Sequence, residues 1–238
     1  KASQVLDAKP ETDKLPAMNI TKILKSYGFT SYFYKVNMKD FTSCLLSTTT
    51  APVAPLISLC EDIENKDIYI SGMAVFDGDK MIGKLNQQES RGVLWVLGKV
   101  KSGVVIVSSP DKQGNITLEI LEAKSKVTPE IRERRIVMHI KIMVESSLSE
   151  QTTSENIATI SYFEKLQKAQ AEVIKQEILA AFDKPKELRA DVFGFGEILH
   201  KKYSKEWKTL KDDWDDVYQL IELDIKVETT IQKTDLLK

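Results

Sequence analysis

The amino-acid sequence predicts an α+β protein made of two α+β domains, residues 1–99 and residues 100–238. Two segments of the second half alternate apolar and polar residues with the period of a strand, and the segments between them carry apolar residues at helical spacing. In addition, the stretch 72–100 indicates a strand, a tight turn, a short strand and an amphipathic helix. This helix leads directly into the first strand of the second domain.

The composition is that of a soluble globular protein, and it argues against some classes of function. The net charge is −1, so the sequence gives no reason to expect the basic surface that binds nucleic acid. The longest apolar runs, such as residues 92–98, are far shorter than the ~20 residues that span a bilayer. Cys44 and Cys60 make no disulfide framework, and we interpret them as partly buried free thiols.

The first domain begins with a polar segment, residues 1–15, for which we expect a loop or a short frayed helix. Asn19 is then expected to cap a helix that Gly28 ends. Residues 31–36 are aromatic and β-branched, which favours a strand. A further helix is predicted to begin at or just after Asn37.

The rest of the first domain predicts a small antiparallel sheet. Residues 53–60 and 66–76 have strand composition, and an Asp-Gly pair at Gly78 is typical of a tight hairpin turn. Residues 81–84 form the returning strand. The polar residues that follow begin a helix that ends at Gly98.

The second domain opens with three predicted strands, residues 104–107, 116–127 and 135–148. The turn 111–115 separates the first two, and Pro129 is expected to interrupt the chain after the second. The third strand alternates most regularly, which predicts a sheet with one face on the core and one face in water.

The capping-box pair Thr152 and Glu155 predicts the start of a long helix that reaches about Phe182 and is ended near Pro185. Its apolar residues share one helical stripe. The change from period 2 to period 3.6 marks the transition from sheet to helix.

A second helix is predicted over residues 191–203 and a third, short one around Trp207. Residues 221–231 then alternate as a last strand, which must return to the sheet after the helices. The order β-β-β-α-α-β predicts an antiparallel sheet with helices packed on one face.

Most candidate sites in the sequence have a simpler structural interpretation. His139 and His200 lack the spacing of a zinc site, so we interpret both as exposed or structural. The sequence Gly194-Phe195-Gly196 lacks the third glycine and the preceding strand of a phosphate-binding loop. We attribute its glycines to close packing of a helix against a neighbour.

The acidic residues 212–216 lack the pattern of an EF-hand, so we predict a solvated loop anchored by its tryptophan. Trp207 and Trp214 are interpreted as core residues. No nucleophile elbow occurs, and Glu89, Glu119 and Glu122 do not stand out among many carboxylates.

The sequence Asn19-Ile20-Thr21 and the sequence Asn115-Ile116-Thr117 match the glycosylation sequon, to which we assign no role. The sequence therefore predicts no catalytic, cofactor-binding or metal-ligating residue.

Several motifs together resemble one family, the C subunit of bacterial spore germinant receptors, the Ger(x)C lipoproteins. The motifs are MAVF at 73–76, DKMIGKL at 79–85, ESRGVLW at 89–95, TLEIL at 117–121, KSKVTP at 124–129, ADVFGFG at 190–196, KKYSKEW at 201–207 and VETTI at 227–231. The resemblance is specific over residues 72–235 and weaker over residues 1–62. Ser204 stands where the family usually has proline.

The resemblance implies a non-enzymatic subunit of a nutrient germinant receptor in the spore inner membrane. It implies two integral membrane proteins as partners, no cofactor, and a lipid on an N-terminal cysteine, exposing the protein on the extracytoplasmic face. Neither Cys44 nor Cys60 follows an apolar segment, and residues 1–10 contain no signal peptide. We therefore expect that the anchor, and an N-terminal domain with it, lie outside this chain.

Two other functions are consistent with the sequence, namely a small-ligand binding module and a hydrolase with dispersed carboxylates. For the receptor subunit, we hypothesise that the wet face of the second sheet and residues 212–216 contact the partners. The segment 89–95 is interpreted as a structural junction, in which Gly83 and Gly92 serve tight turns and close packing.

Overall fold

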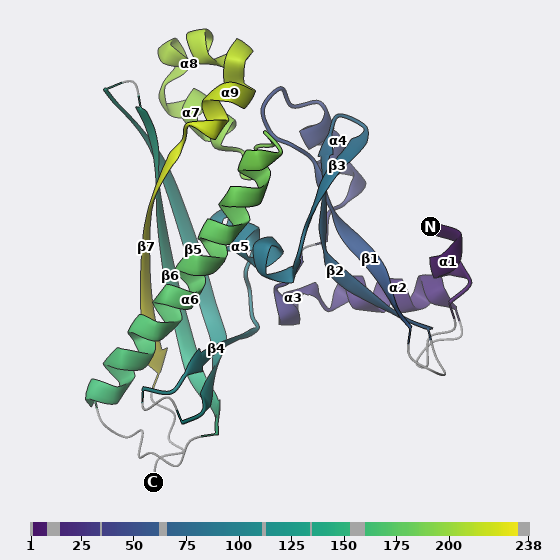
Figure 1. Cartoon of the computed structure of the whole chain (residues 1–238), viewed down its shortest axis with the longest axis vertical. Helices are drawn as coiled ribbons and strands as arrows, with labels where there is room; N and C mark the ends of the chain where they lie inside the picture. Colours follow the sequence, from purple (N-terminus) through teal and green to yellow (C-terminus); the bar gives the residue numbers. More distant parts are fainter. Residues whose placement is uncertain are drawn as a thin grey trace.

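The computed structural model describes two β-sheets with helices between and around them (Figure 1). This arrangement confirms the α+β class. The described residues are 2–8, 15–33, 35–61, 66–110, 113–133, 135–152 and 160–232.

Four short helices precede the first sheet: α1 (Ala2–Leu6), α2 (Pro16–Lys25), α3 (Tyr27–Thr30) and α4 (Met38–Leu45). Of the two predicted starts, Asn37 and Lys39–Asp40, the structure shows the first, because the Asn37 side chain caps α4 by accepting a hydrogen bond from the Asp40 amide at 2.8 Å. The predicted cap at Asn19 is wrong. Asn19 is buried inside α2, which begins at Pro16, a residue whose fixed φ suits the first helical position.

The strand predicted at residues 31–36 is also wrong, since the described part of this segment is irregular. Ser31 has a φ of 52°, in the left-handed region that interrupts a strand. Its hydroxyl donates to the carbonyl of Ser102 and accepts from the Lys101 amide. The segment is therefore held by the link between the two sheets.

The first sheet is antiparallel, in the order β1 (Val53–Glu61), β2 (Lys66–Asp77), β3 (Lys80–Leu85). Gly78 adopts a φ of 54° in the turn between β2 and β3, which confirms the Asp-Gly hairpin.

Helix α5 (Gln87–Leu97) follows with the predicted ends. Asn86 and Glu89 form a capping box, and Gly98 ends the helix with a φ of 63°. Two further glycines serve close packing as expected. A Cβ on Gly83 would lie 2.3 Å from Leu188, and one on Gly92 would lie 2.1 Å from the Glu177 carbonyl oxygen.

The second sheet has the order β4 (Val104–Ser108), β5 (Asn115–Arg132), β6 (Arg135–Gln151), β7 (Glu222–Gln232). The predicted interruption at Pro129 is wrong, because β5 continues through it and Pro129 faces Met138 of β6. Strand β4 pairs with β5 only as far as Glu119. Beyond that point β5 has a free edge, where a proline removes no ladder hydrogen bond.

The helices between β6 and β7 are α6 (Ile160–Glu187), α7 (Phe195–Lys202), α8 (Ser204–Leu210), the 3-10 turn Lys211–Asp213 and α9 (Trp214–Gln219). Pro185 lies inside the last turn of α6. The capping box predicted at Thr152 and Glu155 stays a prediction, because Glu155 lies outside the described residues. The Thr152 hydroxyl instead accepts from the Asn115 amide at 2.9 Å.

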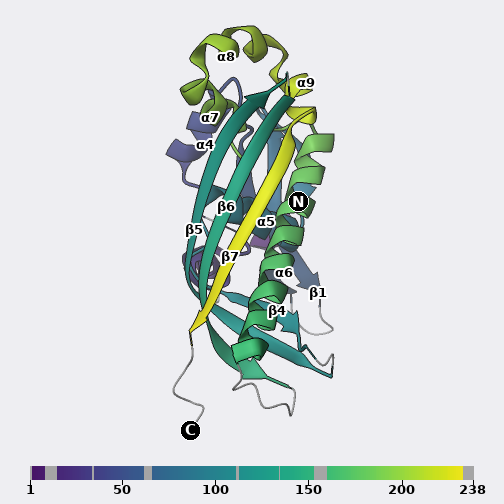
Figure 2. The same cartoon turned by 90° about the vertical axis from the view of Figure 1, so that its left-hand side faces the viewer.

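The prediction of a wholly antiparallel second sheet requires a correction, because β7 runs parallel to β6. Helix α6 contains 28 residues. At about 1.5 Å of rise per residue it runs the length of the sheet, and it returns the chain to the end where β6 began. It packs against β7 and α5 on one face, while no helix lies in front of β5, β6 and β7 in Figure 2.

Helix α5 joins the two sheets through a buried polar cluster. Arg91, 6% exposed, donates to both carboxylate oxygens of Glu177 in α6, and its Nε lies 2.8 Å from Oε2. Trp95 donates its indole N–H to the same Oε2 at 2.8 Å. The buried apolar side chains of both sheets form one continuous core around this helix. The division at residues 99 and 100 stays a prediction.

We predict that Gly92→Ala lowers the free energy of unfolding by about 1–3 kcal/mol, because the new methyl group would force α5 and α6 apart. Gly28→Ala is the matched control. A Cβ on Gly28 meets no atom within 4 Å, so this change should leave stability within about 1 kcal/mol. Urea unfolding measures both. Equal effects would contradict the close approach of the helices.

Candidate functional site

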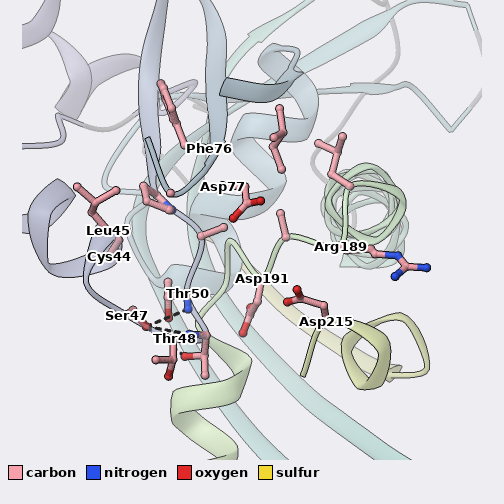
Figure 3. A pocket seen from close by; sticks show the side chains of 17 residues that line it. Cys44, Leu45, Ser47, Thr48, Thr50, Phe76, Asp77, Arg189, Asp191 and Asp215 are labelled. Atoms are coloured by element: carbon pink, nitrogen blue, oxygen red, sulfur yellow. Dashed lines mark hydrogen bonds between the residues drawn. The ribbon is translucent and has the colours of Figure 1, made fainter. Parts of the chain in front are cut away.

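A polar cleft of about 300 Å³ lies where the first sheet meets the helices that precede β7 (Figure 3). Its walls come from the loop between α4 and β1, the β2–β3 hairpin, the chain between α6 and α7, and α9. The polar residues that line it are Cys44, Ser47, Thr48, Thr49, Thr50, Asp77, Arg189, Asp191 and Asp215.

The hydroxyl-rich wall is shaped by local hydrogen bonds. The Ser47 hydroxyl accepts from the amides of Thr49 at 3.2 Å and Thr50 at 3.0 Å, which folds this loop into a tight turn. The Ala51 amide then donates to the backbone carbonyl of Asp191 at 2.9 Å. This last bond joins the two sides of the cleft.

Asp191 forms the floor of the cleft and is 2% exposed. Its carboxylate accepts from the amides of Phe195 at 3.0 Å and Gly196 at 2.8 Å, so it occupies the start of α7. Burial raises the pKa of Asp191 to about 6, although the backbone donors act in the opposite direction. The carboxyl group is held by its own helix and is not free to bind a ligand strongly.

Two further carboxylates face the cleft from opposite walls, Asp77 at the end of β2 and Asp215 in the first turn of α9. Burial raises the pKa of Asp215, and the nearby charge of Asp77 raises it further. Arg189 lines the same wall but donates to Asp216 at 3.0 Å. The charge of Arg189 also lowers the pKa of Asp215, so this arginine offsets the negative charge of the cleft only in part.

The predicted close packing at Gly194-Phe195-Gly196 is confirmed, and it forms part of this site. A Cβ on Gly196 would lie 2.7 Å from Thr49 and 2.9 Å from Cε2 of Trp214. Only a glycine lets the hydroxyl-rich loop approach α7 this closely. The glycines serve contact between protein segments, as expected.

A second polar cluster lies on the open face of the second sheet. His139 of β6 places Nδ1 2.7 Å from Asp224 of β7 and Nε2 2.7 Å from Glu130 of β5. The hydrogen bond with Asp224, and then that with Glu130, raises the pKa of His139. The stabilisation that protonated His139 gives the fold is complete below the ordinary histidine pKa of 6.5. It is lost as the pH rises through the raised pKa of His139.

The remaining sequence candidates are structural in the described residues. His200 stacks on Trp207, with ring centroids 5.5 Å apart, and Trp207 and Trp214 are buried as predicted. The solvated loop predicted at residues 212–216 is wrong, because the segment forms the 3-10 turn and α9, with Trp214 as its anchor.

The cysteines and the singled-out glutamates also have no catalytic arrangement among the described residues. Both cysteines are free, but Cys60 is exposed and not partly buried as expected. Glu89 belongs to the α5 capping box, and Glu122 pairs with Lys124. The sequence analysis did not identify the role of Asp191 at the start of α7. The pattern that could have indicated it is an aspartate shortly before a glycine-rich helix start.

The side chains that the structure describes were also compared with the arrangement that a metal ion needs. Within the ranges given above, no group of three or more His, Cys, Asp or Glu is arranged to hold a metal ion. Over the same residues, no helix has the length and apolar character needed to cross a membrane.

Comparison with known proteins identifies the family to which this chain belongs. Residues 71–235 match the family described as "Spore germination B3/ GerAC like, C-terminal", and residues 1–59 match "Spore germination protein N-terminal domain". The chain therefore belongs to the spore germination B3/GerAC-like family, the C subunits of germinant receptors, which confirms the resemblance.

The individual relatives are germination proteins of Bacillus subtilis. The chain is 26% identical to spore germination protein KC over 99% of its own length and 62% of that protein. It is 29% identical to spore germination protein YndF over 70% of its length and 42% of that protein. The chain thus spans less than two thirds of these relatives.

The crystal structure of the GerBC protein has the same fold. It matches 85% of this chain and 65% of its own, with a TM-score of 0.70 and 20% sequence identity.

We predict that the stability advantage of the wild type over Asp191→Asn shrinks as the pH rises from about 4 to about 6. The native pKa of about 6 lies above the ordinary value of 3.8, so the native state holds this proton more tightly than the unfolded state. The resulting stabilisation is complete below pH 4 and is lost on passing through pH 6.

Urea unfolding of both proteins at pH 4, 5, 6 and 7 measures this difference, with Asp213→Asn as the control at an exposed aspartate. A difference that stays constant, or that grows with pH, would contradict the assignment of the raised pKa to Asp191.

Proposed function

We propose that this chain is part of a non-enzymatic lipoprotein subunit of a nutrient germinant receptor, held at the extracytoplasmic face of the spore inner membrane. The observation that carries the proposal is the match to the GerAC-like family over residues 71–235. A non-enzymatic role agrees with three of the polar clusters described above, which are used in a helix start and in ion pairs.

In this proposal the subunit acts with two integral membrane subunits through its surfaces. Two surfaces fit this role. The face of the second sheet that lies opposite α6 carries alternating charges and is not covered by a helix (Figure 2). The acidic segment 212–216 projects carboxylates from the 3-10 turn and α9, and the side chain of Asp212 is 82% exposed.

Co-purification tests the assembly. The full-length protein, tagged and expressed at its own locus, is expected in the inner-membrane fraction of spores, together with two integral membrane subunits of the receptor. A full-length protein that is recovered without either membrane subunit would overturn the proposal.

We predict that Asp212→Lys combined with Asp213→Lys reduces recovery of the membrane subunits and slows nutrient germination at least about fivefold. The physical reason is loss of charge complementarity at a polar contact, where like-charge contacts cost several kcal/mol. Glu164→Lys combined with Asp183→Lys on the exposed side of α6 makes the same charge change and should leave both readouts unchanged. Normal assembly and germination in the first double variant would exclude this segment as a contact.

A further inference from the structure

We propose that His139 is a pH-dependent clasp on the open face of the second sheet, closed while its imidazole ring carries both protons and half open once the ring has lost one. The clasp joins β5 to β7 across β6, which lies between them. The inference goes beyond the proposed receptor function and does not depend on it, because every group of the clasp belongs to this chain.

The backbone pairing brings the side chains of the clasp together. His139 lies directly opposite Asp224 of β7 and, on its other side, opposite Thr128 of β5. Glu130 is two positions further along β5, and residues two positions apart in a strand point to the same face of the sheet. The imidazole and both carboxylates therefore stand on the face that no helix covers in Figure 2.

The geometry requires both protons on the closed ring. An ionised carboxylate can only accept hydrogen bonds, so each ring nitrogen that meets one must donate. The distance is 2.7 Å from Nδ1 to Asp224 and 2.7 Å from Nε2 to Glu130, in the range of charge-assisted hydrogen bonds. The hydrogen bond from His139, and then that from Arg132, lowers the pKa of Glu130 and keeps this carboxylate ionised.

A neutral ring can hold only one of the two carboxylates. It has a single N–H to donate, and its other nitrogen is then an acceptor that faces an acceptor oxygen. These two atoms repel each other, so one carboxylate is released. The hydrogen bond with Asp224, and then that with Glu130, raises the pKa of His139. The clasp is therefore closed below the ordinary value of 6.5 and half opens as the pH rises through the raised pKa.

The other charged side chains near the ring come from all three strands. They are Lys126 and Arg132 of β5, Arg135 and Lys141 of β6, and Glu222, Lys226 and Glu228 of β7. Except for Lys126, each of them forms an ion pair with a described residue other than His139. Among the described residues, the ion-pair partner of Asp224 is His139. Loss of the ring proton therefore makes this face more negative, and any partner that binds there meets a surface whose charge depends on pH.

The first test is an NMR titration of this chain from about pH 5 to about pH 9, with the ring signals of His139 identified by their loss in His139→Gln. We expect the midpoint of His139 to lie above 6.5. Glu130→Gln combined with Asp224→Asn should shift this midpoint downward, because it removes both charges that hold the second proton.

Glu122→Gln combined with Glu145→Gln is the matched control. Glu122 and Glu145 lie opposite each other on the same face, and Glu145 is six positions along β6 from His139, a distance of roughly 20 Å. Exposed charges separated by more than about 10 Å are largely screened by salt. This double variant should therefore leave the midpoint of His139 unchanged.

The second test is hydrogen exchange of the backbone amides of residues 222–226, at the start of β7, in the wild type and in His139→Gln. Glutamine can donate to one carboxylate and does not titrate, so the variant represents the half-open clasp at every pH. Below the midpoint we expect exchange to be about two- to fivefold slower in the wild type, the effect expected of an exposed ion pair. Above the midpoint the two proteins should exchange at equal rates.

The proposal is wrong if the midpoint of His139 lies at or below 6.5, if both double variants shift it equally, or if the exchange ratio at β7 is the same on both sides of the midpoint. The comparison of the wild type with His139→Gln remains decisive if Glu130→Gln combined with Asp224→Asn does not fold. Because no membrane subunit takes part, these results do not depend on the co-purification experiment.

Discussion

The fold depends on one buried ion pair, between Arg91 of α5 and Glu177 of α6. Removing one partner of such a pair typically costs about 3–5 kcal/mol, because a buried charge is left alone. Here each guanidinium nitrogen of Arg91 and both carboxylate oxygens of Glu177 have a hydrogen-bond partner. Glu177 accepts from Arg91 and from the Trp95 indole, while Arg91 also donates to the Val104 carbonyl at 2.8 Å and covers the ring of Tyr32. This cluster fixes α5, which contacts both sheets, against the long helix that crosses the second sheet.

Helix α6 transmits this constraint to the rest of the molecule. One of its ends lies beside the start of β7, and its length determines that β7 is parallel to β6. Helix α6 also sets the position of the chain after Glu187, where Leu188 packs against Gly83 of the first sheet. The two walls of the cleft are thus brought together by a helix anchored at Arg91, and the Ala51–Asp191 hydrogen bond closes the contact.

The features that could be predicted from the sequence are those set by local interactions. The capping box of α5, the turn at Gly78 and the alternation in β6 each depend on a few neighbouring residues, and the structure shows all three. The strand predicted at residues 31–36 failed because Ser31 bonds to residues 101 and 102, seventy positions away. The predicted antiparallel direction of β7 was wrong because a period of two residues does not specify the direction of a strand.

The cleft is the clearest case of a feature that no local pattern contains. Its aspartates come from β2, from the chain before α7 and from α9, and the one in β2 lies more than a hundred positions before the other two. Each residue alone has an ordinary interpretation as a turn, a cap or a surface charge. They line one cleft only because the hydroxyl-rich loop packs against Gly196, where a Cβ would lie 2.7 Å from Thr49. A site built in this way exists only while the first sheet and the helices before β7 are packed together, so anything that binds there also favours that packing.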